Sequence, residues 1–298
     1  MRTFTAVVNP HAGTAGWSRR AVAARLHPVL ATLSDLGAKV TIEQSRSLEH
    51  AVDLATVAAE RGDVVLAAGG DGTVGALAAA VIRAEGVLGV IPVGRGNDFA
   101  RQLSIPAEPS ALATLLHDAE PSAVDVIDVE GTVVVGSMYA GIDAVANGYF
   151  NQARVLGGAG YHYAALRALA GWRMVSYRVT IDGTRHDVRG YTVVVANSGY
   201  FGNGRHAAPD ARVDDGLLDV IVLTDVSRRA FIAIAMRELY TGVHVNRPEV
   251  LVFRGREVSV EAGRTMPVGG DGELIGTLPA TARVLPGALR VLSGHQTS

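Results

Sequence analysis

Hydrophobic residues in the first 120 positions follow two alternating spacings, one typical of strands and the other of helices. Short apolar or β-branched runs predict strands at 3–9, 39–43, 63–68 and 87–92. Apolar residues at helical spacing predict helices over 17–36, 47–61, 73–85 and 109–118. Strands that alternate with helices indicate a parallel sheet with helices on both faces.

From about position 124 the spacing changes, and β-rich runs broken by Gly, Asp and Asn predominate. They predict an antiparallel sandwich or barrel, with hairpins at 179–188, around an Asp182-Gly183 turn, and at 252–260. Helical stretches at 145–171 and 227–240 interrupt it. We therefore expect a Rossmann-like three-layer α/β domain over 1–124 and a β-rich domain over 125–298, whose C-terminal end packs back on the first domain. Without a Pro- or Ser-rich linker, a ligand cleft between the domains is expected.

Composition and charge exclude several classes of function. The net charge of −2 gives no basic excess, which argues against nucleic-acid binding. The chain has no cysteine, so thiolate chemistry and disulfides are excluded. Lys39 is the single lysine, so a P-loop is absent, and phosphates would have to meet backbone N–H groups, arginine or a metal ion. Neither a signal peptide nor an apolar run of membrane-spanning length is found, so we expect a cytoplasmic protein.

The string GGDG occurs at 69–72 and again at 269–272. The first copy separates a predicted strand from a predicted helix, a position where glycines let an anion approach the backbone. With Gly75 it also satisfies G-x-G-x-x-G, so a dinucleotide-binding dehydrogenase is an alternative. The acidic residue expected about 20 positions later is missing, and Asp71 beside a pyrophosphate requires a bridging cation. A Mg²⁺–nucleotide complex is the better interpretation.

Two further loops after predicted strands have the same character. One contains Gly94, Gly96, Asn97 and Asp98, and we expect Asn97 and Asp98 to cap a helix that begins near Phe99. The other is the stretch VVNPHAGTAG near the start of the chain. Three glycine loops at the carboxyl ends of parallel strands are suited to a triphosphate.

Taken together, these stretches resemble the diacylglycerol-kinase catalytic family, soluble bacterial lipid kinases related to sphingosine kinases. VNPHAG resembles the start of that family, GGDGT its nucleotide signature and GVIPVGRGNDFAR its next glycine loop. APDARVDDGLLDV and VGGDGE resemble its two later acidic motifs. The resemblance covers nearly the whole chain in the expected order.

The resemblance implies a fold like that of NAD kinase and diacylglycerol kinase, with a nucleotide domain and a lipid-acceptor domain, and transfer of the γ-phosphoryl group of ATP to a lipid hydroxyl. Asp271 would be the general base. The positions implied for the nucleotide are Asn9, Pro10, Gly13, Ser45, Gly69, Gly70, Asp71, Gly72, Thr73, Gly94, Arg95 and Asn97. Those implied for Mg²⁺ are Asp71, Asp98 and Asp125 near the nucleotide, and Asp215 with the carbonyls of Arg212 and Leu217 at a structural site.

Two departures keep alternatives open. The Asn-Glu pair usual after GGDGT is replaced by Gly75-Ala76, and Arg95 stands where a serine or threonine is usual. A catalytically weak nucleotide- or lipid-binding regulator is therefore one alternative. NAD kinase is another, although this sequence lacks the Asn-Glu pair and the second-domain motif expected of that family. The stretch 150–172 is either a helix packed on the sheet or a wall of the lipid cleft, with transient contact to the inner membrane surface. An exposed edge of the β-rich domain would allow a homodimer.

Overall fold

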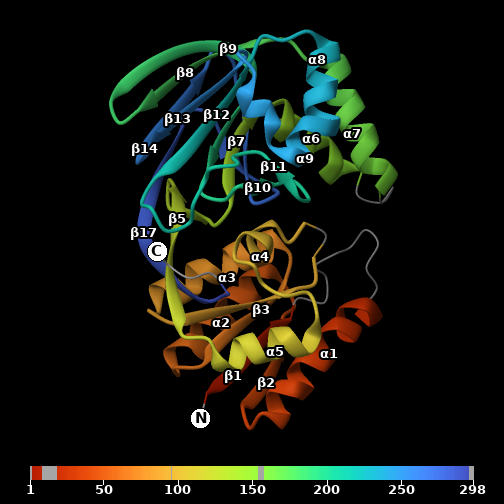
Figure 1. The fold of residues 1–298 in the computed structure, drawn as a ribbon, viewed down its shortest axis with the longest axis vertical. Coiled ribbons are helices and arrows are strands. Elements are labelled where there is room, and N and C mark those ends of the chain that lie inside the picture. The colour runs from red at the N-terminus through yellow and green to blue at the C-terminus, as the bar shows by residue number, and fades with distance from the viewer. Residues whose placement is uncertain (1, 9–18, 95, 154–157, 295–298) are drawn as a thin grey trace. The chain divides into compact units, whose positions relative to one another are not determined.

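The computed structural model describes residues 2–8, 19–94, 96–153 and 158–294. The chain divides into two compact units, one made of Met1–Asp125 with Gly287–Ser298 and the other of Val126–Pro286. Figure 1 shows the helices and strands of both. Each unit has a hydrophobic core of its own and is described separately.

The first unit is built on a parallel sheet with the strand order β2-β1-β3-β4. The C-terminal part of β17 lies parallel to β4, where Val291 pairs with Leu88. The strands are β1 (Thr3–Val8), β2 (Lys39–Gln44), β3 (Val64–Gly69), β4 (Val87–Pro92) and β17 (Ala280–Leu292). The helices are α1 (Arg19–Asp35), α2 (Leu48–Glu60), α3 (Asp71–Arg83), α4 (Asp98–Gln102) and α5 (Pro109–Asp118).

Alternation along the strands distributes the helices over the two faces of this sheet. In β1, Phe4 and Ala6 are fully buried in a core that also contains the apolar residues of α1 and α5. The intervening residues of the strands point to the other face, where α2 packs against α3. The α/β layer structure predicted for the N-terminal half is confirmed.

The second unit is an antiparallel β-structure around one large core. The long strand β9 pairs with β8 and β7 along one side and with β12 along the other. Its strands are β6 (Thr132–Val134), β7 (Ser137–Gly141), β8 (Val175–Ile181), β9 (Thr184–Ala196), β10 (Tyr200–Phe201), β11 (Arg205–His206), β12 (Leu218–Thr224), β13 (Val250–Gly255), β14 (Glu257–Ala262), β15 (Pro267–Gly270) and β16 (Glu273–Thr277), with parts of β5 (Pro121–Val129) and β17. The β-rich second half is confirmed.

Two predicted hairpins have different outcomes. The first is confirmed, because β8 and β9 pair across a turn in which Asp182 and Gly183 both have positive φ. The second is wrong: β13 pairs with β12, while β14 pairs with β8 and β17. Arg256 alone separates β13 from β14, and one residue is too short for a hairpin loop. The Asp182 carboxylate accepts the backbone N–H of Arg256 at 3.0 Å and fixes the bend there.

The two predicted helical stretches of this half are both subdivided. The first contains α6 (Ile142–Gln152) and α7 (Gly158–Gly171). The second contains α8 (Arg228–Ala233), a π-helical turn η2 (Ile234–Glu238), α9 (Leu239–Thr241) and a short 3₁₀ helix η3 (Val243–Asn246). Among the residues that the structure describes, no helix is both long enough and apolar enough to cross a membrane.

Candidate functional site

In the first unit, two loops at the carboxyl ends of neighbouring strands touch each other. Gly70 is the N-cap of α3 and directly follows β3. The loop after β4 approaches it so closely that a Cβ atom at Gly94 would overlap the Cα atom of Gly70. The N–H of Val93 also donates to the carbonyl of Gly69 at 3.2 Å. Two of the three glycine loops predicted from the sequence are therefore adjacent, and glycine is required where they meet.

Asp71 connects these two loops through its carboxylate. Its Oδ1 accepts the backbone N–H of Phe99, in the first turn of α4, at 3.0 Å. The sequence predicted that Asn97 and Asp98 would cap this helix, but Asn97 has a left-handed backbone and makes no side-chain cap bond. Its amide instead bridges the N–H and carbonyl of Gly94, both at 2.9 Å. The side chain that caps α4 therefore comes from the preceding glycine loop.

Two carboxylates converge beside Gly96. A Cβ atom on this glycine would lie 2.9 Å from Oδ2 of Asp71 and 3.3 Å from Oδ2 of Asp98. Burial raises the pKa of Asp71; the Phe99 N–H partly offsets that rise, and the negative charge of Asp98 adds to it. Two like charges in a partly buried corner favour a bound cation.

Whether this corner suits Mg²⁺ depends on its donors. Across the described ranges, no group of three or more acidic or histidine side chains is arranged to hold a metal ion. Mg²⁺ on a nucleotide, however, is typically held by one or two carboxylates together with phosphate and water oxygens. Asp71 and Asp98 therefore fit a nucleotide-bound Mg²⁺, although they do not form a protein-only metal site.

The other residues implied for the nucleotide and its metal are placed as follows. Ser45 is buried and donates from its hydroxyl to the carbonyl of Val8 at 3.3 Å. Asp125 is buried and its carboxylate accepts the N–H of Gly287 at 2.7 Å. Thr73 is buried in the first turn of α3. The remaining positions, Asn9, Pro10, Gly13 and Arg95, lie outside the described residues.

In the second unit, arginine side chains pair with both aspartates of the DDG turn. Oδ1 of Asp215 accepts the N–H of Leu217 at 3.1 Å, and Oδ2 is paired with Arg254. Arg254 also pairs with the buried Asp219 at 3.3 Å. The side chain of Arg212 pairs with Asp214 at 3.1 Å. In this structure the Arg254 guanidinium supplies the positive charge beside Asp215. A structural Mg²⁺ on Asp215 and the carbonyls of Arg212 and Leu217 stays a prediction.

Asp271 occupies the turn between β15 and β16. Asp271 has a φ of 48° and Gly272 a φ of 85°, the two positive values of a type I′ hairpin turn. Its carboxylate accepts three backbone N–H groups from one segment: Val135 at 2.7 Å, Gly136 at 2.8 Å and Ser137 at 3.4 Å. The carboxylate is thus held in one orientation by the single segment 135–137, which is distant from it in the sequence.

Two asparagines that the sequence analysis missed support this turn. Nδ2 of Asn147 donates to the carbonyl of Gly272 at 2.8 Å and to the hydroxyl of Tyr139 at 3.0 Å. The fully buried Asn197 donates from Nδ2 to the carbonyl of Val135 at 3.0 Å, and from its backbone N–H to the carbonyl of Gly136 at 2.9 Å. A buried asparagine at the end of the apolar run VVVAN is the signal that was available in the sequence.

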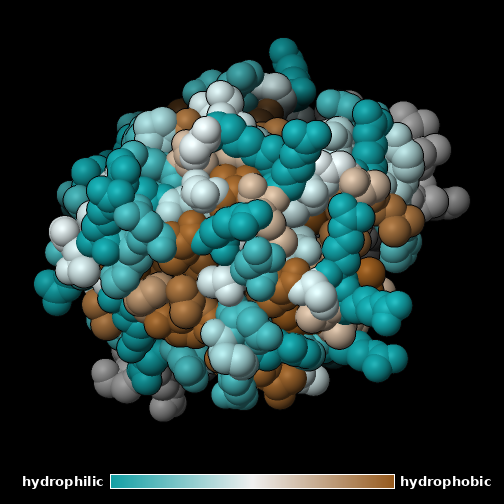
Figure 2. Space-filling model, turned by 90° about the horizontal axis from the view of Figure 1, so that it is seen from above, coloured by the Kyte–Doolittle hydropathy of each residue, from teal (hydrophilic) through white to brown (hydrophobic). Residues whose placement is uncertain are grey.

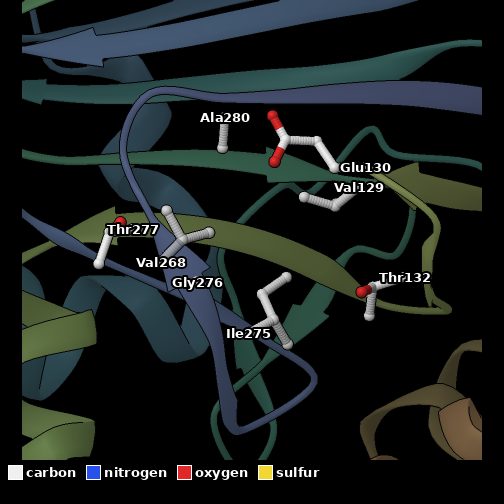
Figure 3. Close-up of a pocket in the computed structure, with 8 residues that line it drawn as sticks. All are labelled: Val129, Glu130, Thr132, Val268, Ile275, Gly276, Thr277 and Ala280. Carbon is white, nitrogen blue, oxygen red and sulfur yellow. The ribbon is translucent and has the colours of Figure 1, made fainter.

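A small cavity lies against the same hairpin (Figure 3). Its volume is about 110 Å³, below the roughly 300–1,000 Å³ typical of small-molecule sites. Its lining residues are Val129, Glu130, Thr132, Val268, Ile275, Gly276, Thr277 and Ala280. We assign it no ligand.

Each half of the chain matches a known protein domain. Residues 3–129 match the diacylglycerol kinase catalytic domain, and residues 136–293 match the YegS C-terminal NAD kinase beta sandwich-like domain. A diacylglycerol kinase of Mycobacterium tuberculosis is 30% identical over 97% of this chain and 94% of its own length. A probable YegS-like lipid kinase of Pseudomonas aeruginosa is 33% identical over 76% of this chain and 75% of its own.

Solved structures agree on the fold. A putative diacylglycerol kinase from Bacillus anthracis superposes with a TM-score of 0.78 at 23% identity, over 98% of this chain and 97% of that one. At this identity the likeness concerns the fold alone. The two domain matches and the full-length relative decide the family. The resemblance predicted from the glycine loops and acidic turns is confirmed, and the chain belongs to the diacylglycerol kinase family of lipid phosphotransferases.

Proposed function

We propose that this protein transfers the γ-phosphoryl group of ATP to the hydroxyl group of a lipid such as diacylglycerol, with Asp271 as the general base. The observation that carries the proposal is the carboxylate of Asp271, held at a hairpin turn by three backbone N–H groups. Phosphoryl transfer asks the protein mainly for alignment, charge neutralisation and orientation of the attacking hydroxyl. The two units carry residues suited to these tasks.

The glycine loops of the first unit support binding of the triphosphate. Gly70 follows β3 and is the N-cap of the thirteen-residue helix α3, and the first-turn N–H groups of such a helix favour a bound anion. Asp71 and Asp98 would hold Mg²⁺, which neutralises phosphate charge when bound. The arrangement contains no lysine, so the backbone carries the role that a P-loop shares with its lysine.

Asp271 supports the acceptor side of the reaction. In the proposed step the lipid oxygen bonds to the γ-phosphorus, the bond from that phosphorus to the β–γ bridging oxygen breaks, and ADP leaves with the electron pair. The hydroxyl proton passes to the carboxylate of Asp271. A carboxylate oxygen can accept two hydrogen bonds, so the bond from Val135 to Oδ2 is compatible with a second one from a substrate hydroxyl.

A second cavity in the same unit supports a lipid as the acceptor. It measures about 240 Å³, also below the roughly 300–1,000 Å³ typical of a whole small-molecule site, so it could hold only part of an acyl chain. It lies between α6, α7 and the beginning of β15. Tyr149, Trp172 and Met266 supply the apolar part of its lining, and Arg264 and Thr265 supply polar groups. The Arg264 guanidinium lies 5.3 Å from the Trp172 ring. From Pro267 in its lining to Asp271 the strand runs four residues, about 13 Å at the rise of a β-strand. An acyl chain reaching from a hydroxyl at Asp271 could cover that length.

The decisive experiment compares Asp271→Asn with Asp182→Asn. Asp182 is a matched control, because it also has a φ of 48°, precedes a glycine in a hairpin turn and accepts backbone N–H groups. With diacylglycerol in detergent micelles, we expect Asp271→Asn to lower kcat by roughly 10²–10⁴ and leave the Kd for ATP unchanged. Asp182→Asn should keep near wild-type kcat. Substantial turnover by folded Asp271→Asn protein would refute the assignment.

The acceptor is identified by a panel of substrates. ATP consumption coupled to a reporter would be measured with diacylglycerol, other lipid alcohols and NAD. We expect turnover with a lipid alcohol. Turnover with NAD alone would replace the lipid kinase with an NAD kinase, and ATP binding without turnover on any acceptor would identify a regulator.

A further inference from the structure

The helical segment Arg228–Thr241 in the second unit packs against the core along one side, and near its end the Arg205 guanidinium lies 5.3 Å from the Tyr240 ring. It begins at Ser227, whose hydroxyl accepts the N–H of Ala230 at 3.2 Å. On its inner side Phe231 stacks on Tyr191, with ring centroids 4.3 Å apart, and Ile234 is 2% exposed. Leu239 packs against the same core. The segment is therefore held firmly to the unit through its inner side.

The opposite side presents large apolar residues to solvent. Ile232 is 47% exposed, Met236 60% and Tyr240 50%, and each is four residues from the next. An α-helical turn holds about 3.6 residues, so in a regular α-helix a row spaced by four would drift around the axis. The π-helical turn η2 holds more residues per turn and lies in the middle of the row, which counteracts that drift. The turn thus keeps the three side chains on one face.

Arginines extend and flank this row. Arg228 lies four residues before Ile232 and continues the row, while Arg229 and Arg237 lie on the neighbouring one. All three are exposed, and within the described residues none of them forms an ion pair. Glu238, the one acidic residue between positions 227 and 247, is neutralised by Arg247 with two contacts of 2.6 Å. This face is thus positively charged on a chain whose net charge is −2.

We propose that the Ile232–Tyr240 face, made of Arg228, Arg229, Ile232, Met236, Arg237 and Tyr240, docks the protein on an anionic lipid bilayer. Apolar side chains that enter the interface, a tyrosine at headgroup level and unpaired arginines are the features that bind a helix in the plane of such a membrane. Figure 2 looks onto the molecule from the end at which Figure 1 draws α8, and apolar residues there lie in patches between hydrophilic ones. The inference deepens the proposed function, because a bilayer is where a lipid acceptor resides, but it does not depend on Asp271 being the base.

The test is sedimentation with vesicles of phosphatidylglycerol and phosphatidylcholine at a 3:7 ratio, compared with pure phosphatidylcholine. The variants are Ile232→Gln with Met236→Gln, and Arg228→Gln with Arg229→Gln and Arg237→Gln. Glutamine keeps helix propensity, so the helix should remain folded. A matched control is Val57→Gln, which replaces a residue that is 51% exposed on another helix, α2.

We expect the wild-type protein to bind the anionic vesicles and not the zwitterionic ones. The apolar double variant should bind at least about tenfold more weakly, and each arginine removed should weaken binding about fivefold. The control should bind as wild type, and all variants should keep their activity on diacylglycerol in micelles.

Absence of wild-type binding, equal binding to both vesicle types, or unchanged binding of both multiple variants would each overturn the proposal. A concentration-dependent dimer in light scattering that Met236→Gln abolishes would overturn it in favour of self-association. Loss of vesicle binding with intact micellar activity separates this inference from the proposed function.

Discussion

Asp143 is expected to make the protein less stable as the pH rises through the weakly acidic range. It stands in the first turn of α6, and both its carboxylate oxygens lie 2.8 Å from the Thr192 hydroxyl. Burial raises the pKa of its carboxyl from an ordinary value of 3.8 to about 6, although hydrogen bonds from Thr192 and the N–H of Ala144 act in the opposite direction.

The sign follows from the proton balance. Folded Asp143 keeps its proton up to about pH 6, whereas the unfolded chain loses it near pH 4. Unfolding therefore releases a proton between these values, and the free energy of unfolding falls as the pH rises through that window. Each pKa unit corresponds to about 1.4 kcal/mol, so the full loss is about 3 kcal/mol. About 2 kcal/mol of it falls between pH 4.5 and 8, where other carboxylates interfere less.

The perturbation is Asp143→Asn, which keeps an acceptor for Thr192 but cannot ionise. Thermal unfolding at pH 4.5, 6 and 8 would be compared with wild type. The stability of the variant relative to wild type should rise by about 2 kcal/mol across this range, or roughly 4–8 °C in Tm. Asp53→Asn, at an exposed position on α2, serves as the control and should show no such trend. A difference between Asp143→Asn and wild type that stays constant from pH 4.5 to 8 would refute the reasoning.

Two further predictions concern the carboxylates of the proposed site. Gly96→Ala places a methyl group 2.9 Å from Oδ2 of Asp71. The Kd for Mg²⁺–ATP, measured by calorimetry, should therefore rise at least about tenfold, with Tm within about 2 °C of wild type. An unchanged Kd would show that Asp71 and Asp98 do not belong to the nucleotide site. Asn197→Ala removes the donor that fixes the carbonyl of Val135. The kcat should therefore fall at least about tenfold, while the KM for ATP stays within about twofold. Equal changes in kcat and KM would contradict a specific role for Asn197 in holding Asp271.

The layers of the first unit could be predicted from the sequence because the spacing of apolar residues within each segment indicates which of its sides is buried. The continuous apolar run at 63–68 becomes the buried strand β3, and the helical spacing of Val22, Leu26, Val29 and Leu33 becomes the buried side of α1. The pairing of β13 and β14 could not be predicted, since local pattern indicates strands but not partners. Which strand β14 joins is decided by β8 and β17, at positions distant in the chain.

The candidate site divides in the same way. The glycine loops and Asp271 lie in short strings whose residue types suit their chemistry, so the sequence indicates them. The sequence does not indicate the hydrogen bonds that hold these loops in place, because their partners are distant in the chain. Asp71 caps a helix that begins 27 residues later, and Asn197 holds a segment 62 residues away. The spacing of apolar residues likewise does not indicate the π-helical turn at Ile234–Glu238.

The two copies of GGDG show how one string can acquire two roles. Asp71 begins a helix, whereas Asp271 occupies a left-handed turn, so the copies share no backbone conformation. They share a carboxylate that accepts backbone N–H groups from another segment: Phe99 for the first, and Val135 with its two successors for the second. Asp182 does the same at an ordinary hairpin. Such bonds to a charged acceptor contribute about 1.5–3 kcal/mol each, so holding a loop is sufficient reason for any of these aspartates. Asp271→Asn and Asp182→Asn should therefore lower Tm alike, and only a loss of turnover confined to Asp271→Asn separates a catalytic carboxylate from one that fixes a turn.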